Sequence, residues 1–501
     1  MSRDKIVDFS SSNSIKTFAQ KLKGKTLRDA CEEEIELHSY KGKGNFGQIL
    51  EKYYFGYEPN SNSEADFNEA GLELKSSPLK TLKNGEYRSK ERLVLNIINY
   101  LDVHKEEFYS SSFYTKNAHL LLVFYLHEKE LDILDYEIKI VDDWKYPRED
   151  LLIIQRDWEV INKKIKEGKA HELSEGDTYY LGACTKGSTA LKSLRDQPFS
   201  DLKAKQRAYS LKQGYVNHII AKLTEKDEGV YGKILDLSDS AINKYTRDLA
   251  DKGDLTEVLN EPKVAYESRG SYEVARDPLE ESVTSRFIPF YEKSITEIHS
   301  LLKLDINSSA KNYFASITNT ILGLAKDQKI EEFEKADIIV KTVRLKENNL
   351  PKEDISFPAF EYEELVQENW DYSSFKDFLE KKFFFVFYQF NGDRLYLKKV
   401  KFWNMPYTDI NIAKKVWERT VVVVSKGQIV KEVTDKGIRK SFFPKKTENY
   451  VSHVRPHAKN SNDTYPLPVK DSLTGVKEYT KHSFWLNGSY VKDEIYLTKE
   501  Y

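Results

Sequence analysis

Two uninterrupted apolar runs are the clearest feature of the hydrophobic pattern. Leu120–Leu126 and Phe383–Tyr388 each have the length of a strand, and both are much too short to cross a bilayer. Glu149–Lys166, by contrast, carries a tryptophan and is predicted to be a helix. Helical and strand patterns follow one another without regular alternation, so we expect an α/β fold with a mixed sheet flanked by helices.

A helix and a strand are predicted close together in the N-terminal half. Apolar residues recur at helical spacing within Gly44–Gly56. In the strand that follows, Leu72 and Leu74 alternate with polar residues and can face the core. Glu73 and Lys75 would then share the opposite face, two residues apart.

A long repeat organises the chain. WKYPREDLLIIQRDWE, Trp144–Glu159, reappears as WNMPYTDINIAKKVWE, Trp403–Glu418. Ordered agreement over much of each half indicates two copies of one domain. The other blocks that recur in the same order are Phe46 with Phe314, Asp66–Lys75 with Glu332–Lys341, Val123–Tyr125 with Val386–Tyr388, and Tyr209–Val216 with Phe484–Val491.

The repeat predicts three parts of the chain. Residues 1–225 form the first copy and residues 282–501 the second. The connector, 226–281, mixes charged and glycine-bearing stretches with short amphipathic runs, so we expect it to be partly helical.

Composition adds little about partners. With 78 basic and 80 acidic side chains among 501 residues, the net charge is near zero, so any DNA-binding surface must come from local clustering. Only Cys31 and Cys184 are present, which fits a reducing compartment. The N-terminus has no apolar signal segment, and we expect a soluble cytoplasmic protein.

Asp66, Glu73 and Lys75 form the pattern D-x6-E-x-K, which carries the candidate chemistry. Mg²⁺ prefers hard oxygen ligands and keeps several waters, so the two carboxylates, a phosphate oxygen and the Leu74 carbonyl would make a suitable site. A lysine beside the metal can orient or help deprotonate the attacking water and offset charge on the phosphate. The pattern predicts Mg²⁺-dependent cleavage of DNA.

The alternative for this spacing is a solvated strand face, since acids and lysines are common. The second copy favours a site, because Glu73 is replaced there by Ile339 while Lys75 is kept as Lys341. An apolar side chain cannot ligate Mg²⁺. The second copy is therefore expected to keep the fold and lack the chemistry.

Two further residues are candidates for the same site. Glu51, in the predicted helix before the strand, can point toward the carboxylates, and its counterpart in the second copy is Asn319. Lys116, just ahead of an apolar strand, is a possible phosphate contact. The alternative for Glu51 is a surface glutamate.

The stretch between Lys186 and Lys212 is locally basic. Such groups would hold phosphates and could read guanine edges in the major groove, although a solvated charged loop is the alternative. Its basic residues are Lys186, Lys192, Arg195, Lys203, Lys205, Arg207 and Lys212, interleaved with Phe199 and Tyr209.

These residues resemble a known family. The N-terminal half looks like MutH, the DNA mismatch-repair nicking endonuclease, with G-x-x-G-x-x-L-E at Gly44–Glu51, D-x6-E-L-K at Asp66–Lys75 and Asp157–Glu159. The whole chain is similar to the Sau-type restriction endonucleases, which contain a MutH-like domain and cut at GATC. Segments such as SKERLVLNIINY, GKAHELSEG and DLKAKQRAYSLK carry this similarity over nearly the full length.

The resemblance implies a type II restriction endonuclease that requires Mg²⁺. It would make double-strand breaks in duplex DNA at 5′-GATC-3′ and leave 5′-phosphate and 3′-hydroxyl ends. Asp66, Glu73 and Lys75 match the family's catalytic residues, Glu51 its helix glutamate and Lys116 its additional lysine. The metal ligands would be the carboxylates of Asp66 and Glu73 and the backbone carbonyl of Leu74.

The family's base-reading region would fall at Lys186 and along Arg207, Ser210 and Lys212. The family has a tyrosine where this chain has Ser210, so the contact made by that tyrosine is not carried over.

The second half would be a MutH-like domain without catalytic carboxylates that binds DNA or acts allosterically. One active centre cuts one strand, so self-association on a palindromic site is expected. No membrane or small-molecule substrate is expected. Two other functions stay open: a repair-type nickase with the same chemistry, and a non-catalytic DNA-binding regulator, which predicts loss of the carboxylates in both copies.

Overall fold

The computed structural model describes residues 7–31, 45–59, 64–187, 193–226, 229–234, 278–325 and 328–498. The chain forms two compact units. The first comprises Met1–Ala275 with Asp327–Asp337, and the second comprises Arg276–Lys326 with Ile338–Tyr501. Most of the predicted connector, residues 235–277, lies outside the described residues.

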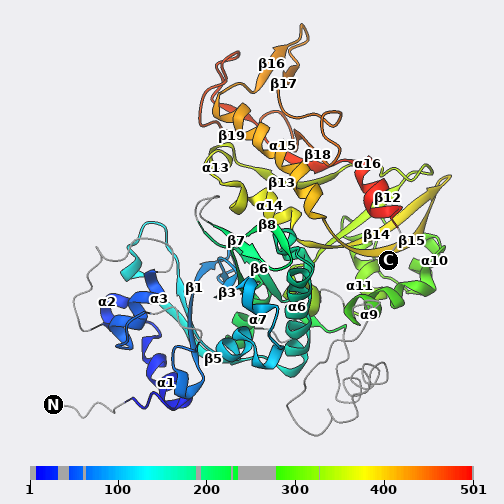
Figure 1. Cartoon of the computed structure of the whole chain (residues 1–501). Coiled ribbons are helices and arrows are strands. Elements are labelled where there is room, and N and C mark those ends of the chain that lie inside the picture. Colours follow the sequence, from blue (N-terminus) through cyan, green and yellow to red (C-terminus); the bar gives the residue numbers. More distant parts are fainter. Residues whose placement is uncertain are drawn as a thin grey trace. The chain divides into compact units, whose positions relative to one another are not determined.

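The first unit contains a four-stranded mixed sheet in the order β2-β1-β4-β5, of which β1 and β5 are labelled in Figure 1. β1 (Glu73–Thr81) runs parallel to β4 (His119–Leu126), which runs antiparallel to β5 (Ile138–Lys145). β2 (Tyr87–Ser89) pairs antiparallel with β1. The mixed sheet expected from the sequence is confirmed. β4 contains the predicted apolar strand, and both of its faces are apolar after His119 because its residues are buried as far as Phe124.

The ends of helices in the first unit carry polar caps or charged residues that stabilise them. α1 (Ser12–Ala19) begins at Ser11, whose side chain accepts the N–H of Ser14. α6 (Arg148–Lys166) begins after Pro147, with acidic residues in its first turn and lysines in its last, as the helix dipole favours. The other helices are α2 (Leu27–Ala30), α3 (Asn45–Ile49), α4 (Tyr100–Val103), α5 (Ser112–Asn117) and α7 (Gln213–Leu223).

A second, antiparallel sheet has the order β3-β9-β6, with strands Leu93–Ile97, Arg207–Leu211 and Leu181–Thr185. Asp157 of α6 ties the helix to this sheet. Its buried carboxylate accepts the main-chain N–H groups of Tyr179–Leu181 at 2.6–2.9 Å. A hairpin of β7 (Leu194–Gln197) and β8 (Ser200–Lys205) follows β6.

A short part of the C-terminal half of the sequence belongs to the first unit, and we call Gln328–Asp337 the returning segment. Its strand β11 (Lys329–Ile330) pairs in parallel with β10 (Tyr231–Gly232). Its helix α12 (Glu331–Lys335) packs against α7. The sequence repeat had placed these residues in the second copy.

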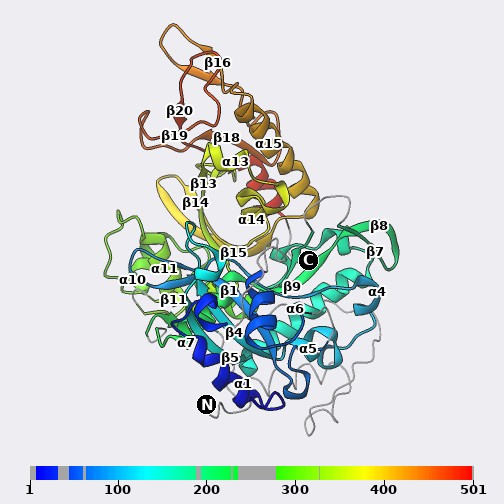
Figure 2. The same ribbon diagram turned by 90° about the vertical axis from the view of Figure 1, so that its left-hand side faces the viewer.

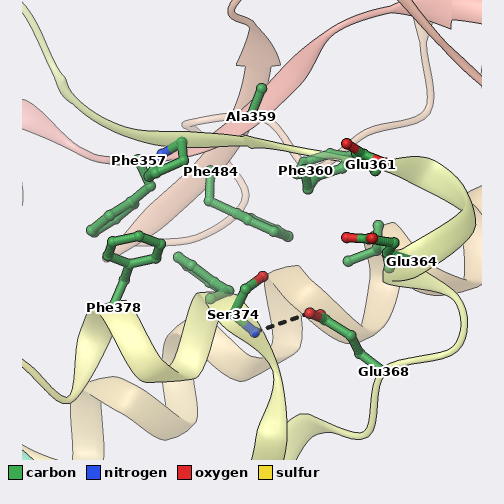
Figure 3. A pocket seen from close by; sticks show the side chains of 12 residues that line it. Phe357, Ala359, Phe360, Glu361, Glu364, Glu368, Ser374, Phe378 and Phe484 are labelled. Carbon is green, nitrogen blue, oxygen red and sulfur yellow. Dashed lines mark hydrogen bonds between the residues drawn. The ribbon is translucent and has the colours of Figure 1, made fainter. Parts of the chain in front are cut away.

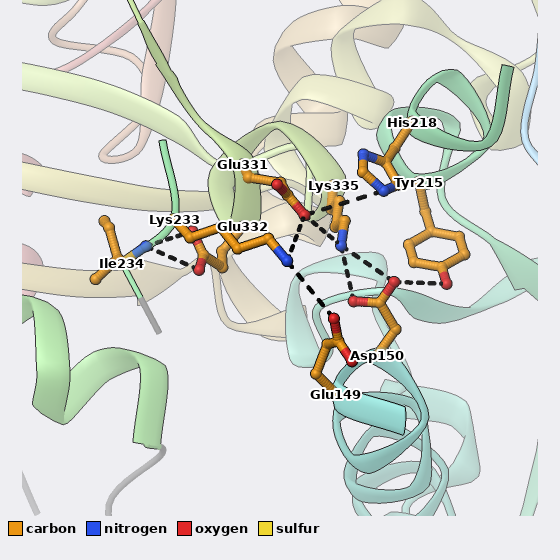
Figure 4. Close-up of polar contacts among 9 residues, drawn as sticks. All are labelled: Glu149, Asp150, Tyr215, His218, Lys233, Ile234, Glu331, Glu332 and Lys335. Carbon is orange, nitrogen blue, oxygen red and sulfur yellow. Dashed lines mark hydrogen bonds and ion pairs between the residues drawn. The ribbon is translucent and has the colours of Figure 1, made fainter. Parts of the chain in front are cut away.

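Buried ion pairs fasten the returning segment (Figure 4). The Lys335 ammonium lies 2.8 Å from both Asp150 of α6 and Glu331 of its own helix. The Glu332 carboxylate accepts the N–H of Ile234 at 2.9 Å. Close packing adds to this, because a Cβ on Gly214 of α7 would lie 1.9 Å from the Glu334 carbonyl oxygen. The returning segment therefore completes the core of the first unit.

The second unit has a sheet of order β12-β14-β15, with the same directions as β1-β4-β5. β12 (Ile339–Leu345) runs parallel to β14 (Lys382–Asn391), and β14 runs antiparallel to β15 (Arg394–Asn404). A second sheet is antiparallel, in the order β13-β21-β18. Its strands are Ile355–Phe360, His482–Leu486 and Ser452–Pro456. Figure 2 shows the long helix α15 (Tyr407–Ser425) beside β18.

The remaining elements of the second unit are short. Two small hairpins pair β16 (Val430–Val433) with β17 (Arg439–Ser441) and β19 (Thr464–Pro466) with β20 (Glu478–Thr480). The other helices are α9 (Pro278–Phe287), α10 (Ile295–Leu301), α11 (Tyr313–Ile321), α13 (Tyr362–Leu365), α14 (Ser374–Leu379) and α16 (Gly488–Tyr490), with a π-helix at Val491–Tyr496. Within the described ranges, no helix is long and apolar enough to cross a membrane.

Candidate active site

A tight turn brings Asp66 against the first residue of β1. Phe67 and Leu72 pair across the turn, and Gly71 adopts φ 58°, a conformation that favours glycine. The N–H of Asp66 donates to Glu73 Oε2 at 3.0 Å, and the N–H of Leu74 donates to Asp66 Oδ2 at 3.0 Å. The Glu73 carboxylate is thus fixed by the backbone at Asp66, and the Asp66 carboxylate by the backbone of β1.

Two lysines approach the Glu73 carboxylate. Lys75, two residues along β1, hydrogen-bonds Glu73 Oε1, and Lys116 Nζ at the end of α5 lies 3.7 Å from the same oxygen. Lys116 also donates to the carbonyl of Glu64 at 2.9 Å. Glu73 is only 1% exposed, and burial raises its pKa despite both lysines.

Glu51 lies in an unusual turn of helix. After α3 the chain continues as a π-helix over Leu50–Tyr54, where the sequence pattern predicted one regular helix. Such π turns are rare and are often found at functional sites. Burial raises the pKa of Glu51 to about 7, and the negative charges of Asp66 and Glu73 act in the same direction. The predicted residues Glu51, Asp66, Glu73, Lys75 and Lys116 therefore lie in one neighbourhood.

This neighbourhood suits a hard divalent cation. In the described part of the chain, no three His, Cys, Asp or Glu side chains converge in a metal-binding geometry. Mg²⁺ needs fewer protein ligands, since it is usually held by one or two carboxylates and keeps several waters. Asp66 and Glu73 provide that pair beside Leu74. The pKa values of Glu51 and Glu73 are raised mainly by burial and further by neighbouring negative charges, and a cation would stabilise the ionised forms of both carboxyls.

The four residues predicted to contact DNA lie in the β6–β9 region. Lys186 directly follows β6 and is half-buried. Arg207, Ser210 and Lys212 are buried on or directly after β9, and Arg207 donates to the Ala183 carbonyl. Residues 188–192 of the basic stretch lie outside the described residues. In this conformation, Lys186 is the member of the set that is not buried.

A separate hollow of about 190 Å³ lies in the second unit (Figure 3). Its wall is largely aromatic, with Phe357, Phe378 and Phe484 among its lining residues. Glu368, on its rim, accepts the N–H of Ser374 at 3.1 Å. None of the candidate catalytic residues lines this hollow, so it is distinct from the carboxylate site.

Sequence reasoning missed the groups that support the site. The carbonyl of Glu64 anchors Lys116, and the hydroxyl of Tyr57 is buried close to the carboxylates. A main-chain carbonyl leaves no signal in a residue pattern. A single tyrosine after a helix is also unremarkable, so neither could be found without the fold.

The sequence around these residues is similar to that of known proteins. The family model for the DNA mismatch repair enzyme MutH matches residues 55–157, a range that includes Asp66, Glu73, Lys75 and Lys116. The DNA mismatch repair protein MutH of Vibrio parahaemolyticus is 25% identical over 198 residues, which cover 39% of this chain and 85% of that protein. The MutH of Vibrio campbellii is 24% identical over 211 residues, 41% of this chain and 90% of that protein.

A much longer match decides the family. The type II restriction enzyme Sau3AI of Staphylococcus aureus is 37% identical over 488 residues, which cover 90% of this chain and 92% of that enzyme. The chain belongs to the Sau3AI-like type II restriction enzymes. This restriction endonuclease therefore carries its MutH-like nuclease domain in the N-terminal region, where the candidate catalytic residues lie.

Proposed function

We propose that this restriction endonuclease makes Mg²⁺-dependent double-strand breaks in duplex DNA at 5′-GATC-3′ and leaves 5′-phosphate and 3′-hydroxyl ends. The observation that carries the proposal is the interlocked pair Asp66 and Glu73 with Lys75 hydrogen-bonded to Glu73. The family resemblance supplies the sequence GATC, and the expected place of action is the cytoplasm.

Each residue has a distinct part in this proposal. Asp66, Glu73 and the Leu74 carbonyl hold Mg²⁺, which supplies a Lewis acid for the phosphate and a more acidic water. Lys75 orients that water and offsets negative charge that develops on the phosphate. Lys116, fixed by the Glu64 carbonyl, would contact the phosphate from beside the same Glu73 oxygen as Lys75, and Glu51 would add negative charge near the metal ligands.

For the DNA-binding surface, we propose that Lys186 and the β9 residues Arg207, Ser210 and Lys212 form the base-reading region. Its support is the family resemblance and the position of Lys186 at the end of β6. Because the β9 side chains are buried in this conformation, contact with bases requires that DNA binding rearrange the surroundings of this strand.

Glu73→Ala tests the active site directly. We expect no cleavage of plasmid DNA by the variant and nearly unchanged DNA binding, because the change removes a metal ligand and no phosphate contact. Glu69→Ala is the matched control, since Glu69 is an exposed acid in the same turn and should leave cutting intact. Normal cutting by Glu73→Ala would end this assignment of the active site.

We further propose that residues of about 282–501 are a duplicated MutH-like domain that binds DNA or acts allosterically without cutting, with the returning segment of that range joined to the first unit. Supporting this, β12-β14-β15 repeats the order and directions of β1-β4-β5. Ile339 opens β12 opposite Phe383 as Glu73 opens β1 opposite Leu120. The Glu332 carboxylate is bound to the Ile234 backbone in the first unit and is thereby withdrawn from any such site.

A further inference from the structure

Tyr57 joins the two segments that carry the acidic side chains of the active site. Its N–H donates to the Glu51 carbonyl at 3.1 Å. Its ring packs edge-on against Phe67, with centroids 5.5 Å apart, and Phe67 directly follows Asp66. The position of the tyrosine is therefore fixed from both sides.

The hydroxyl of Tyr57 is closed off from solvent and has no hydrogen-bond partner among the residues that the structure describes. Burial and the negative charges of Asp66, Glu51 and Glu73 raise its pKa far above the usual value, so the phenol stays protonated. Buried polar groups are nearly always hydrogen-bonded, and an exception calls for an explanation such as a water or ion that completes the site.

We propose that Tyr57 is a positioning residue whose hydroxyl holds a water of the Mg²⁺ hydration shell beside Asp66 and Glu51. The inference rests on the proposed metal site and adds a residue to it. Mg²⁺ keeps several waters when proteins bind it, and groups that hydrogen-bond such waters or ligands tune metal affinity. The charges of Asp66, Glu51 and Glu73 act on this phenol, so it lies close to the proposed metal ligands.

Tyr54, the last residue of the π-helix and three residues before Tyr57, provides a matched comparison. Its hydroxyl donates to the Phe18 carbonyl at 2.8 Å and is thus already satisfied. Replacing Tyr54 by Phe removes a hydrogen bond of the fold, whereas replacing Tyr57 by Phe removes a hydroxyl that has no described partner. The two variants should therefore differ both in stability and in metal affinity.

The test is binding of Mn²⁺, a probe for Mg²⁺, to the full-length protein without DNA, followed by electron paramagnetic resonance of the unbound ion. We expect Tyr57→Phe to weaken Mn²⁺ binding about tenfold, the lower end for loss of such a supporting group. Its melting temperature without metal should be unchanged or higher. Tyr54→Phe should keep wild-type Mn²⁺ affinity and melt a few degrees lower, roughly 2–4 °C.

Glu73→Ala separates failure of this inference from failure of the metal site. If Glu73→Ala loses Mn²⁺ binding but Tyr57→Phe binds as wild type, the role of Tyr57 is refuted and the metal site stands. If Glu73→Ala itself binds Mn²⁺ as wild type, both the metal site and the role of Tyr57 are refuted. Equal weakening of Mn²⁺ binding by Tyr54→Phe would also refute the role of Tyr57, because the effect would then follow from general disturbance of the local structure.

Discussion

Charge and burial oppose one another at the residues of the active site. Glu51 and Glu73 are carboxyls that burial would keep neutral, while Lys75 and Lys116 favour their ionised forms. A divalent cation, like the lysines, would favour the ionised forms of these carboxyls. In the proposed site, a proton and a metal ion would therefore compete for the same carboxylates.

This competition predicts a pH dependence of metal binding. The pKa of Glu51 is raised to about 7, so Glu51 is protonated below that pH and becomes an anion as pH rises through it. Mn²⁺ affinity should therefore increase between about pH 6 and about pH 7 and level off near pH 8. The Glu51→Gln variant should have weaker binding with a flatter profile. Titrations of both proteins at several pH values test this, and identical profiles would contradict it.

Some residues of this site can be predicted from the sequence and others cannot, for a physical reason. Strand alternation alone puts Glu73 and Lys75 on one face, and Asp66 is linked to them by the short spacing of the D-x6-E-x-K pattern. Glu51 and Lys116 come from other elements, so their positions in the sequence suggest them only as candidates, and the family resemblance was needed to match them to the site. No sequence pattern marks Tyr57, because its proposed role depends on packing against Phe67 and not on its spacing from other residues.

Among the elements, the strongly apolar strands are the ones that the sequence predicts well. Leu120–Leu126 lies within β4 and Phe383–Tyr388 within β14, because a strand that is buried on both faces must be apolar on both. The returning segment was not predicted to join the first unit. Its decisive contact, between Lys335 and Asp150, spans 185 positions in the sequence, and local patterns carry no information at that range.

The returning segment also makes a prediction about stability. Asp150 is 1% and Lys335 4% exposed, so Lys335→Met leaves a buried carboxylate without its cation and should cost about 3–5 kcal/mol. Lys329→Met is the control, because the Lys329–Glu334 pair is exposed and is worth about 1 kcal/mol or less. Urea unfolding of both variants measures the difference. Equal midpoints would mean that the returning segment does not stabilise the first unit.

At the scale of the whole molecule, one set of catalytic carboxylates must account for a double-strand break. The chain offers Asp66 and Glu73 in its first unit, whereas Ile339 stands at the equivalent place in its second. Two chains on a palindromic site would supply one cut to each strand. We therefore predict that cleavage rate rises more steeply than in proportion to protein concentration when protein is limiting. Strict proportionality in a dilution series would favour successive cuts by one chain.

The most direct measurement is incubation of the purified protein with unmethylated circular plasmid, with and without Mg²⁺, followed by sequencing of the product ends. We predict discrete double-strand fragments that carry GATC at their 5′ ends, and only when Mg²⁺ is present. Nicked circles alone would contradict double-strand cleavage and indicate a repair-type nickase. Plasmid that stays intact under all conditions would contradict the nuclease assignment and favour a DNA-binding regulator.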